Sequence, residues 1–175
     1  MNRVCAFIFV TAAVASAGCA TTGATPRPFP TPQAHAAGGP APASVLATPA
    51  AGHAMGYGVA GTALSLRGTP YLNGGADPVG FDCSGFVTYV FGQNGVAVPR
   101  TVTELFRAGR QVAGPQLEPG DLVFFTTVSP GASHVGIAIG GDEFVHAPSS
   151  AGEVRVERMS APYWATRFVG ARRVL

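Results

Sequence analysis

The sequence predicts an α+β domain over residues 55–175, in which helices come first and an antiparallel sheet follows. Two observations lead to this fold class. Apolar residues between Phe81 and Phe91 recur with the 3.6-residue period of a helix that is buried along one stripe. After Leu122 the apolar residues run continuously or alternate with a period of two, as they do in strands.

Residues 1–18 are predicted to be a signal peptide, because one charge at Arg3 precedes a short apolar run and then small residues. The apolar run is shorter than the about 20 residues of a membrane-spanning helix. The segment before Cys19 resembles the lipobox of bacterial lipoproteins, which implies cleavage before Cys19 and acylation of that cysteine, with palmitate among the acyl chains. By the same resemblance, Ala20 implies an outer-membrane lipoprotein that faces the periplasm. Ser16 replaces the usual leucine, so ordinary secretion is the alternative.

Residues 19–54 are predicted to be a linker, because Ala, Pro, Thr and Gly dominate and large apolar residues are scarce. A flexible chain of this length would average about 30 to 35 Å from end to end. It would let a domain anchored through Cys19 search a zone close to the membrane. His35 and His53 are interpreted as solvated histidines of this linker.

Charge and cysteine usage exclude two classes of protein. The formal net charge is +2, and the eleven basic residues, all arginine, are scattered, so we expect no nucleic-acid partner. Only Cys83 of the three cysteines lies inside the predicted domain, which argues against a disulfide framework. The question for Cys83 is therefore whether its thiol is chemically reactive, and not which cysteine it pairs with. We expect a monomer that needs no cofactor.

Local caps mark the helices. A short helix is predicted over residues 59–64, where apolar residues form a helical stripe, and Gly68-Thr69-Pro70 ends it. A second helix begins at Cys83, with Asp82 as its N-cap, and ends at Asn94-Gly95. A third, over residues 102–108, is expected after the cap at Thr101.

The strands follow these helices. Leu122–Phe125 is a continuous apolar run and is predicted to be a buried central strand. In the next strand, His134, Gly136 and Ala138 share one face, and the small residues there are expected to let a helix pack closely. Further strands are expected at residues 143–147, 154–156 and 167–174.

Cys83 is interpreted as a catalytic nucleophile. A thiol attacks as a thiolate, so its pKa has to come down from about 8.5. The helix dipole contributes about 0.3 to 1 kcal/mol, less than the about 1.36 kcal/mol of one pKa unit, and the neighbouring Asp82 carboxylate opposes it. A histidine partner is therefore needed, and His134 and His146 are the two in the strand region.

The two histidines act together only if they lie on the same face of the sheet. Their separation is 146 − 134 = 12 residues, so a plain two-residue turn would place them on opposite faces. A bulge or a loop of odd length is therefore predicted. A three-residue loop from Gly140 to Asp142 would set His146 opposite Gly136, with His134 on the diagonal and within reach.

Several motifs stand in order along the predicted domain. They are Gly68-Thr69-Pro70-Tyr71 with Gly74-Gly75, Phe81-Asp82-Cys83-Ser84-Gly85-Phe86-Val87, Pro99-Arg100-Thr101, Pro119-Gly120-Asp121-Leu122-Val123-Phe124-Phe125, Ser133-His134-Val135-Gly136-Ile137 and Phe144-Val145-His146-Ala147-Pro148. Together they resemble the NlpC family of bacterial cell-wall cysteine peptidases, from about residue 57 to the C-terminus. The resemblance implies a papain-like fold and hydrolysis of peptide bonds in peptidoglycan stem peptides or crosslinks. It makes Cys83 the nucleophile, His134 the base and His146 the residue that orients the base.

The resemblance also implies substrate contacts. Tyr71 matches a tyrosine that lines the site near the oxyanion, and Asp82 and Ser84 match residues that hold a substrate amino group in some members. The alternative for Tyr71 is an aromatic buried beside a glycine turn, and for Asp82 it is plain helix capping. Departures from the family pattern concern substrate preference more than catalysis; they are Asn73, Val102 and Leu105.

Two other functions stay open at this point. The chain could be a non-catalytic lipoprotein that binds murein, or a thiol-dependent amidase or acyltransferase. A metal site is not expected, because one cysteine and two histidines lack a fourth ligand. The scissile bond is also open, between the crosslink from D-alanine to diaminopimelate and the stem bond after D-glutamate.

Overall fold

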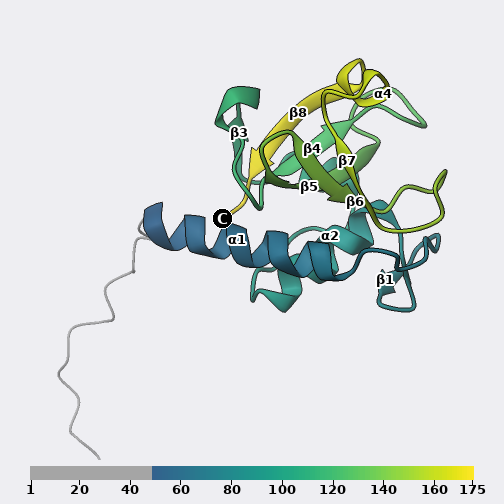
Figure 1. Cartoon of the computed structure of the whole chain (residues 1–175), viewed down its shortest axis with the longest axis horizontal. Helices are drawn as coiled ribbons and strands as arrows, with labels where there is room; N and C mark the ends of the chain where they lie inside the picture. The colour runs from purple at the N-terminus through teal and green to yellow at the C-terminus, as the bar shows by residue number, and fades with distance from the viewer. Residues whose placement is uncertain (1–48) are drawn as a thin grey trace, which may run out of the picture. The chain divides into compact units, whose positions relative to one another are not determined.

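The structure, a computed structural model, describes residues 49–175, which contain four α-helices and a six-stranded antiparallel sheet (Figure 1). The helices are α1 (Pro49–Ser65), α2 (Cys83–Gln93), α3 (Val102–Leu105) and α4 (Pro162–Ala165), with a 3₁₀ turn η1 (Gly114–Gln116). The sheet has the order β3-β8-β4-β5-β6-β7, and its strands are β3 (Arg110–Val112), β4 (Leu122–Phe125), β5 (His134–Gly140), β6 (Glu143–His146), β7 (Arg155–Arg158) and β8 (Phe168–Arg173). A separate ribbon of β1 (Ala76–Asp77) and β2 (Gly80–Phe81) precedes α2. The predicted α+β class is confirmed.

The predicted signal peptide, Cys19 and most of the predicted linker lie outside the described residues. In the part that the structure describes, no helix combines the length and the apolar character needed to cross a membrane.

The six-stranded sheet separates two hydrophobic clusters. The helical cluster joins buried residues of α1 and α2 to one face of β4 and β5, and Figure 1 shows both helices on the same side of the sheet. The second, here named the Trp164 cluster, consists of Val112, Val123, Phe125, Ala138, Phe144, Trp164 and Ala171. Strand β4 alternates between the two, since Leu122 and Phe124 belong to the helical cluster. All four residues of β4 are 0% exposed, so the predicted buried central strand is confirmed.

Both predicted ends of α2 are confirmed. The Asp82 side chain accepts a hydrogen bond from the Gly85 amide, and Asn94 caps the other end before Gly95, whose φ is 76°. The apolar stripe of the helix packs against α1 and β5, and each such side chain contributes about 1.5 to 3 kcal/mol when fully buried. Its members are Phe86, Val87, Val90 and Phe91, all 0% exposed. The packing of this stripe orients the helix that begins at Cys83.

Helix α1 begins earlier than predicted, at Pro49 and thus inside the predicted linker 19–54. Gly56 of this helix packs closely on the turn before β4, where an added Cβ would lie 2.2 Å from the Pro119 carbonyl oxygen. His53 belongs to α1 and not to a linker, and its Nε2 lies 2.9 Å from Glu118 Oε2, although its side chain is exposed to solvent as expected. Both contacts involve residues far along the chain, and the local composition of the segment does not reveal them.

Helix α3 ends at Leu105 rather than at residue 108, and β3, which was not predicted, follows it. The chain turns between them at Gly109, whose φ of 65° is incompatible with a continued helix. Gly109 also packs on the backbone of β8, since an added Cβ would lie 2.1 Å from the Arg173 carbonyl oxygen. The pairing of β3 with β8 therefore determines where α3 stops.

The small residues of β5 lie on the face away from α1 and α2, so neither of these helices makes the close packing that was predicted there. Val135 and Ile137 instead point toward α1 and α2, because the larger side chains bury more apolar surface there. Gly136 lies on the other face, where the Phe144 ring fills the space, and an added Cβ would lie 2.6 Å from Phe144 Cδ2.

The hairpin of β5 and β6 contains the predicted irregularity. Ile137 pairs with Val145, but Gly140 pairs with Glu143, so the register shifts between the two and Ile139 is the extra, bulged residue. The predicted bulge is confirmed, although the turn has two residues rather than the three of the expected loop. The bulge places His134 and His146 on one face of the sheet.

We predict that Gly85→Ala destabilises the domain and that Gly92→Ala in the same helix does not. A Cβ on Gly85 would lie 2.0 Å from the Gly75 carbonyl oxygen, so the start of α2 would have to move. Overpacking of this kind lowers the free energy of unfolding by about 1 to 3 kcal/mol. A Cβ on Gly92 meets nothing within 4 Å, and alanine there should raise the free energy of unfolding by about 0.5 to 1 kcal/mol. Urea denaturation measures both, and equal effects contradict the packing of α2 on the Gly75 turn.

Candidate active site

Cys83, the predicted nucleophile, is the first residue of α2 and lies against the start of β5. Burial raises the pKa of its thiol, and the negative charge of Asp82 raises it further. Hydrogen bonds from the amides of Val135, Ser84 and Cys83 itself oppose this increase without cancelling it. Because Val135 directly follows His134, this contact brings the thiol to the strand that carries the predicted base.

His134 and His146 form a buried pair. Nε2 of His134 lies 2.7 Å from Nδ1 of His146, and the two rings cross at 83°. Burial lowers the pKa of His134 to about 4. Burial, together with the charges of His134 and Arg155, lowers the pKa of His146 to about 2. Both imidazoles are therefore neutral at neutral pH, and the pair can accept a proton.

The resting site holds a neutral thiol beside neutral imidazoles. The expectation that the pKa of Cys83 comes down from about 8.5 is not met in this state, because burial penalises the thiolate and the imidazolium alike. Neutral groups of this kind favour general-base catalysis, in which proton transfer to an imidazole accompanies attack by the sulfur. Within residues 49–175, no group of three histidine, cysteine or carboxylate side chains is arranged to hold a metal ion.

Trp164 belongs to the site, and the sequence reasoning missed it. Its ring stacks on His134 at 5.7 Å and 24° and meets the His146 ring edge-on at 4.9 Å and 90°. A cavity of about 130 Å³ opens beside it, with His134, Pro148 and Tyr163 among its walls. Trp164 thus packs against both imidazoles and lines the cavity that His134 borders. The available signal was that Trp164 is the only tryptophan of the chain.

Tyr71 lies near the thiol. Burial raises the pKa of its phenol most, and the charges of Cys83 and Asp82 raise it further, which shows that both groups are close. The Tyr71 amide donates to the Gly152 carbonyl at 2.7 Å, and this contact fixes the backbone. The phenol is therefore protonated at neutral pH and can donate a hydrogen bond beside the sulfur. Its role near the oxyanion remains a prediction.

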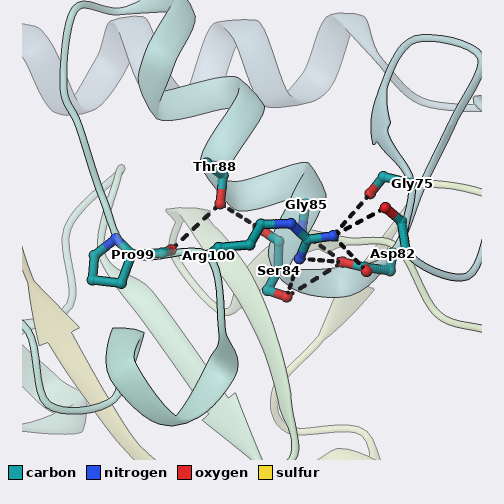
Figure 2. A network of polar contacts seen from close by, with 8 residues as sticks. Gly75, Asp82, Ser84, Gly85, Thr88, Pro99 and Arg100 are labelled. Atoms are coloured by element: carbon teal, nitrogen blue, oxygen red, sulfur yellow. Dashed lines mark hydrogen bonds and ion pairs between the residues drawn. The ribbon is translucent and has the colours of Figure 1, made fainter.

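Asp82 and Ser84, the predicted substrate contacts, are joined to Arg100 (Figure 2). Arg100 Nη1 donates to Asp82 Oδ1 at 3.0 Å and Nη2 donates to Oδ2 at 2.7 Å, a bidentate ion pair. Nη1 also donates to Ser84 Oγ at 2.7 Å, and Nη2 donates to the Gly75 carbonyl at 3.4 Å. Asp82 Oδ1 accepts the Gly85 amide as well, at 2.6 Å. The network connects the Gly75 turn, the start of α2 and the segment before α3.

The Asp82 carboxylate is ionised and fully engaged. Burial raises its pKa, but hydrogen bonds from Arg100, the Gly85 amide and Ser84, with the charge of Arg100, outweigh burial and lower the pKa overall. These contacts confirm the capping of α2, whereas contact with a substrate amino group remains a prediction. The motif Pro99-Arg100-Thr101 was recognised in the sequence, but it did not reveal that Arg100 holds the Asp82 carboxylate.

We predict that the free energy of unfolding depends on pH through Asp82. Since the folded pKa is lowered, ionised Asp82 stabilises the fold above its unfolded pKa of about 3.9, and this stability is lost as pH falls through the folded value. Asp82→Asn keeps a capping oxygen but loses the ion pair, so it should cost about 1 to 2 kcal/mol at pH 7 and flatten the curve below pH 4. Glu153→Gln, at an exposed carboxylate, is the control. Denaturation between pH 2 and 7 tests this, and an unchanged slope in Asp82→Asn contradicts it.

Comparison with protein-family models matches residues 68–173 to the NlpC/P60 family. The chain is 43% identical over 112 residues to the probable peptidoglycan endopeptidase LytE of Bacillus subtilis, covering 63% of this chain and 32% of LytE. It is 44% identical over 110 residues to the murein DD-endopeptidase/murein LD-carboxypeptidase MepS of Escherichia coli, covering 62% of this chain and 57% of MepS. The chain thus spans about a third to just over half the length of these curated relatives.

Solved structures show the same fold. The peptidoglycan hydrolase RipB of Mycobacterium tuberculosis superposes with a TM-score of 0.62 at 32% identity, covering 79% of this chain and 73% of RipB. The NlpC/p60 domain of the peptidoglycan hydrolase SagA superposes with a TM-score of 0.58 at 36% identity, covering 67% of this chain and 97% of that domain. The predicted papain-like fold is confirmed. Since the family model covers more than half of the chain, including Cys83, His134 and His146, the chain belongs to the NlpC/P60 family.

Proposed function

We propose that this chain is a cell-wall endopeptidase that hydrolyses peptide bonds of peptidoglycan through Cys83, His134 and His146. The observation that carries the proposal is the buried 2.7 Å contact between the two imidazoles, beside a thiol at a helix N-terminus. A nucleophile, a base and an orienting group are the requirements of covalent amide hydrolysis. The printed names of LytE and MepS support peptidoglycan as the substrate class.

In the first half of the reaction, Sγ of Cys83 attacks the amide carbonyl while Nδ1 of His134 takes the thiol proton. Nε2 of His134 is occupied by His146, which leaves Nδ1 as the accepting nitrogen. The carbonyl oxygen becomes an oxyanion, and we propose the Cys83 amide and the Tyr71 hydroxyl as its donors. The C–N bond then breaks, His134 passes its proton to the departing amine, and the acyl group stays on Cys83 as a thioester.

In the second half, water hydrolyses the thioester. Neutral His134 accepts a proton from the water as its oxygen attacks the carbonyl, the C–S bond breaks, and the proton returns to the sulfur of Cys83. A His134 pKa of about 4 favours the neutral imidazole at neutral pH, the form that both halves of the reaction need at their start.

Asp82 and Ser84 are proposed to hold a free amino group of the substrate beside the nucleophile. The ionised carboxylate next to Cys83 supports this proposal, because it supplies the negative charge that an ammonium group requires. In the free protein Arg100 forms an ion pair with the Asp82 carboxylate, so a bound ammonium group would share this carboxylate with Arg100.

The proposal includes an anchor. Cleavage after residues 1–18 and acylation of Cys19 would hold the domain on the outer membrane through its Ala- and Pro-rich linker, within reach of the murein in the periplasm. Secretion without a lipid is the alternative.

We expect Cys83→Ala to abolish cleavage of purified muropeptides, because no thiol remains to form the thioester. Removal of a nucleophile costs on the order of 10⁴ to 10⁶ in rate. Crosslinked dimers and uncrosslinked stem peptides are digested separately, and mass spectrometry of the products identifies the scissile bond. Gly92→Ala is the matched control, since it changes the same helix at a position with free space.

Failure of the native chain to cleave either substrate rejects the peptidase proposal. Binding of murein without cleavage would then leave a murein-binding lipoprotein. A thioester trapped on Cys83 only with acyl donors other than muropeptides would instead indicate an amidase or acyltransferase.

We expect Cys19→Ser to remove the lipid anchor. Labelling with radioactive palmitate should disappear, and the protein should leave the outer-membrane fraction for the soluble periplasmic or secreted fraction. Cys5→Ser is the control, because Cys5 lies in the predicted signal peptide and its loss should leave labelling intact. A native chain that is unlabelled and soluble establishes the secreted alternative.

A further inference from the structure

The His146 ring has a second nitrogen that the proposed mechanism does not use. Nε2 of His146 is inaccessible to solvent and makes no hydrogen bond among residues 49–175. The whole residue is 0% exposed, so no solvent reaches this nitrogen. A buried polar atom left unsatisfied costs about 1 to 3 kcal/mol, and native proteins place a partner group near such atoms.

Glu157 is the group that faces this nitrogen. It lies on β7 opposite Phe144 and on the diagonal from His146, which is itself paired with Arg155. Glu157 Oε1 is 3.9 Å from His146 Nε2. Its other oxygen, Oε2, accepts the indole N–H of Trp164, and Arg155 Nε lies 3.3 Å from Oε1. Trp164 and Arg155 thus hold the carboxylate in front of the imidazole.

The protons on the two rings follow from the mechanism. For His134 to receive the Cys83 proton at Nδ1, its Nε2 has to carry a hydrogen, which it donates to Nδ1 of His146. His146 is neutral and accepts at Nδ1, so its own hydrogen lies on Nε2, the nitrogen that faces Glu157. The other tautomer of His146 would set two N–H groups against each other between the rings. A carboxylate at Nε2 therefore favours the tautomer that the reaction needs.

We propose that Glu157 is a positioning residue that extends the site to the series Cys83, His134, His146 and Glu157. The inference rests on the proposed function, because it takes His134 as the base. At 3.9 Å the contact with His146 is electrostatic, and it shortens to a hydrogen bond when the imidazole pair becomes charged during attack. Glu157 acts through His146 and touches neither the substrate nor the sulfur.

The charges around His146 give Glu157 a second effect. His134 faces the ring from β5, and Arg155 and Glu157 face it from β7. The Arg155 guanidinium opposes a positive charge on the imidazoles. Glu157 pairs with Arg155 and so offsets this repulsion. Without the Glu157 carboxylate, the Arg155 guanidinium would be unpaired beside His146. Its positive charge would then make formation of the imidazolium during attack less favourable.

The tautomer of His146 is the first test. The full chain is labelled with ¹⁵N at histidine and studied in detergent micelles. Long-range ¹H–¹⁵N spectra report which nitrogen of each imidazole is protonated. The variants His134→Gln and His146→Gln assign the signals to the two rings. The native chain should show His146 protonated at Nε2, Glu157→Ala should mix the two tautomers, and Glu157→Gln should keep Nε2–H because its amide oxygen still accepts. Glu143→Gln is the matched control, since it removes a carboxylate of neighbouring strand β6 that pairs with Arg158 at 3.7 Å, on the opposite face.

The reactivity of Cys83 is the second test, and it needs no peptidoglycan. Alkylation by iodoacetamide at pH 7 should slow about tenfold in Glu157→Ala, the factor that corresponds to a lost hydrogen bond to a charged group. The rise of the rate with pH should move to higher pH, because the thiolate and imidazolium pair forms less readily. Glu157→Gln keeps the acceptor but not the charge, so it should slow alkylation by a smaller factor, and Glu143→Gln should match the native chain. Mass spectrometry of the peptide that contains Cys83 measures the reaction at that thiol.

A folded Glu157→Ala variant with the native tautomer and the native alkylation profile overturns the proposal. Where Glu157→Ala does not fold, Glu157→Gln decides, because it retains an acceptor for the Trp164 indole; an alkylation profile identical to that of the native chain then overturns it. A different result is a native chain that fails to cleave muropeptides while the Glu157 variants still change the tautomer of His146 and the alkylation of Cys83. That result rejects the proposed function and leaves the positioning role of Glu157 intact.

Discussion

The buried hydrogen bond between His134 and His146 is the constraint on which the candidate site depends. It forms because the bulge at Ile139 returns both side chains to one face, and because Gly136, opposite His146, leaves space for the Phe144 ring. Burial of two neutral imidazoles costs far less than burial of one imidazolium, so the fold favours the neutral pair. In the proposed mechanism, charge then arises only during attack, when the proton leaves the thiol.

The nucleophile side of the site depends on two other contacts. Gly85 lets the first turn of α2 touch the backbone at Gly75, and Arg100 binds the carboxylate that caps this turn. The sequence contains a conflict at this point, since Asp82 is the best local cap for α2 and yet its charge raises the pKa of the Cys83 thiol. The Arg100 guanidinium pairs with the Asp82 carboxylate without displacing the cap.

Predictions from the sequence succeed where the signals are local. The cap at Asp82, the apolar stripe and the stop at Asn94 lie within one short segment, so α2 was predicted with both ends. The start of α1 was not, because Gly56 and His53 are held by Pro119 and Glu118, which are distant in sequence. For the same reason β3 was missed: its first two residues are exposed, and only pairing with β8 makes it a strand.

The sequence by itself determined the fold class, the thiol at the head of α2, the two histidines and the need for an irregular hairpin, because periodicity, capping and face parity depend only on residues close along the chain. The tertiary structure decided which further side chains join them. Trp164 packs against both imidazoles and Glu157 faces the unpartnered nitrogen of His146, although both lie on later elements and neither was identified as a site residue from the sequence. It also decided the protonation states, since burial and distances through space set the pKa of a thiol or an imidazole, and neither can be read from the order of residues.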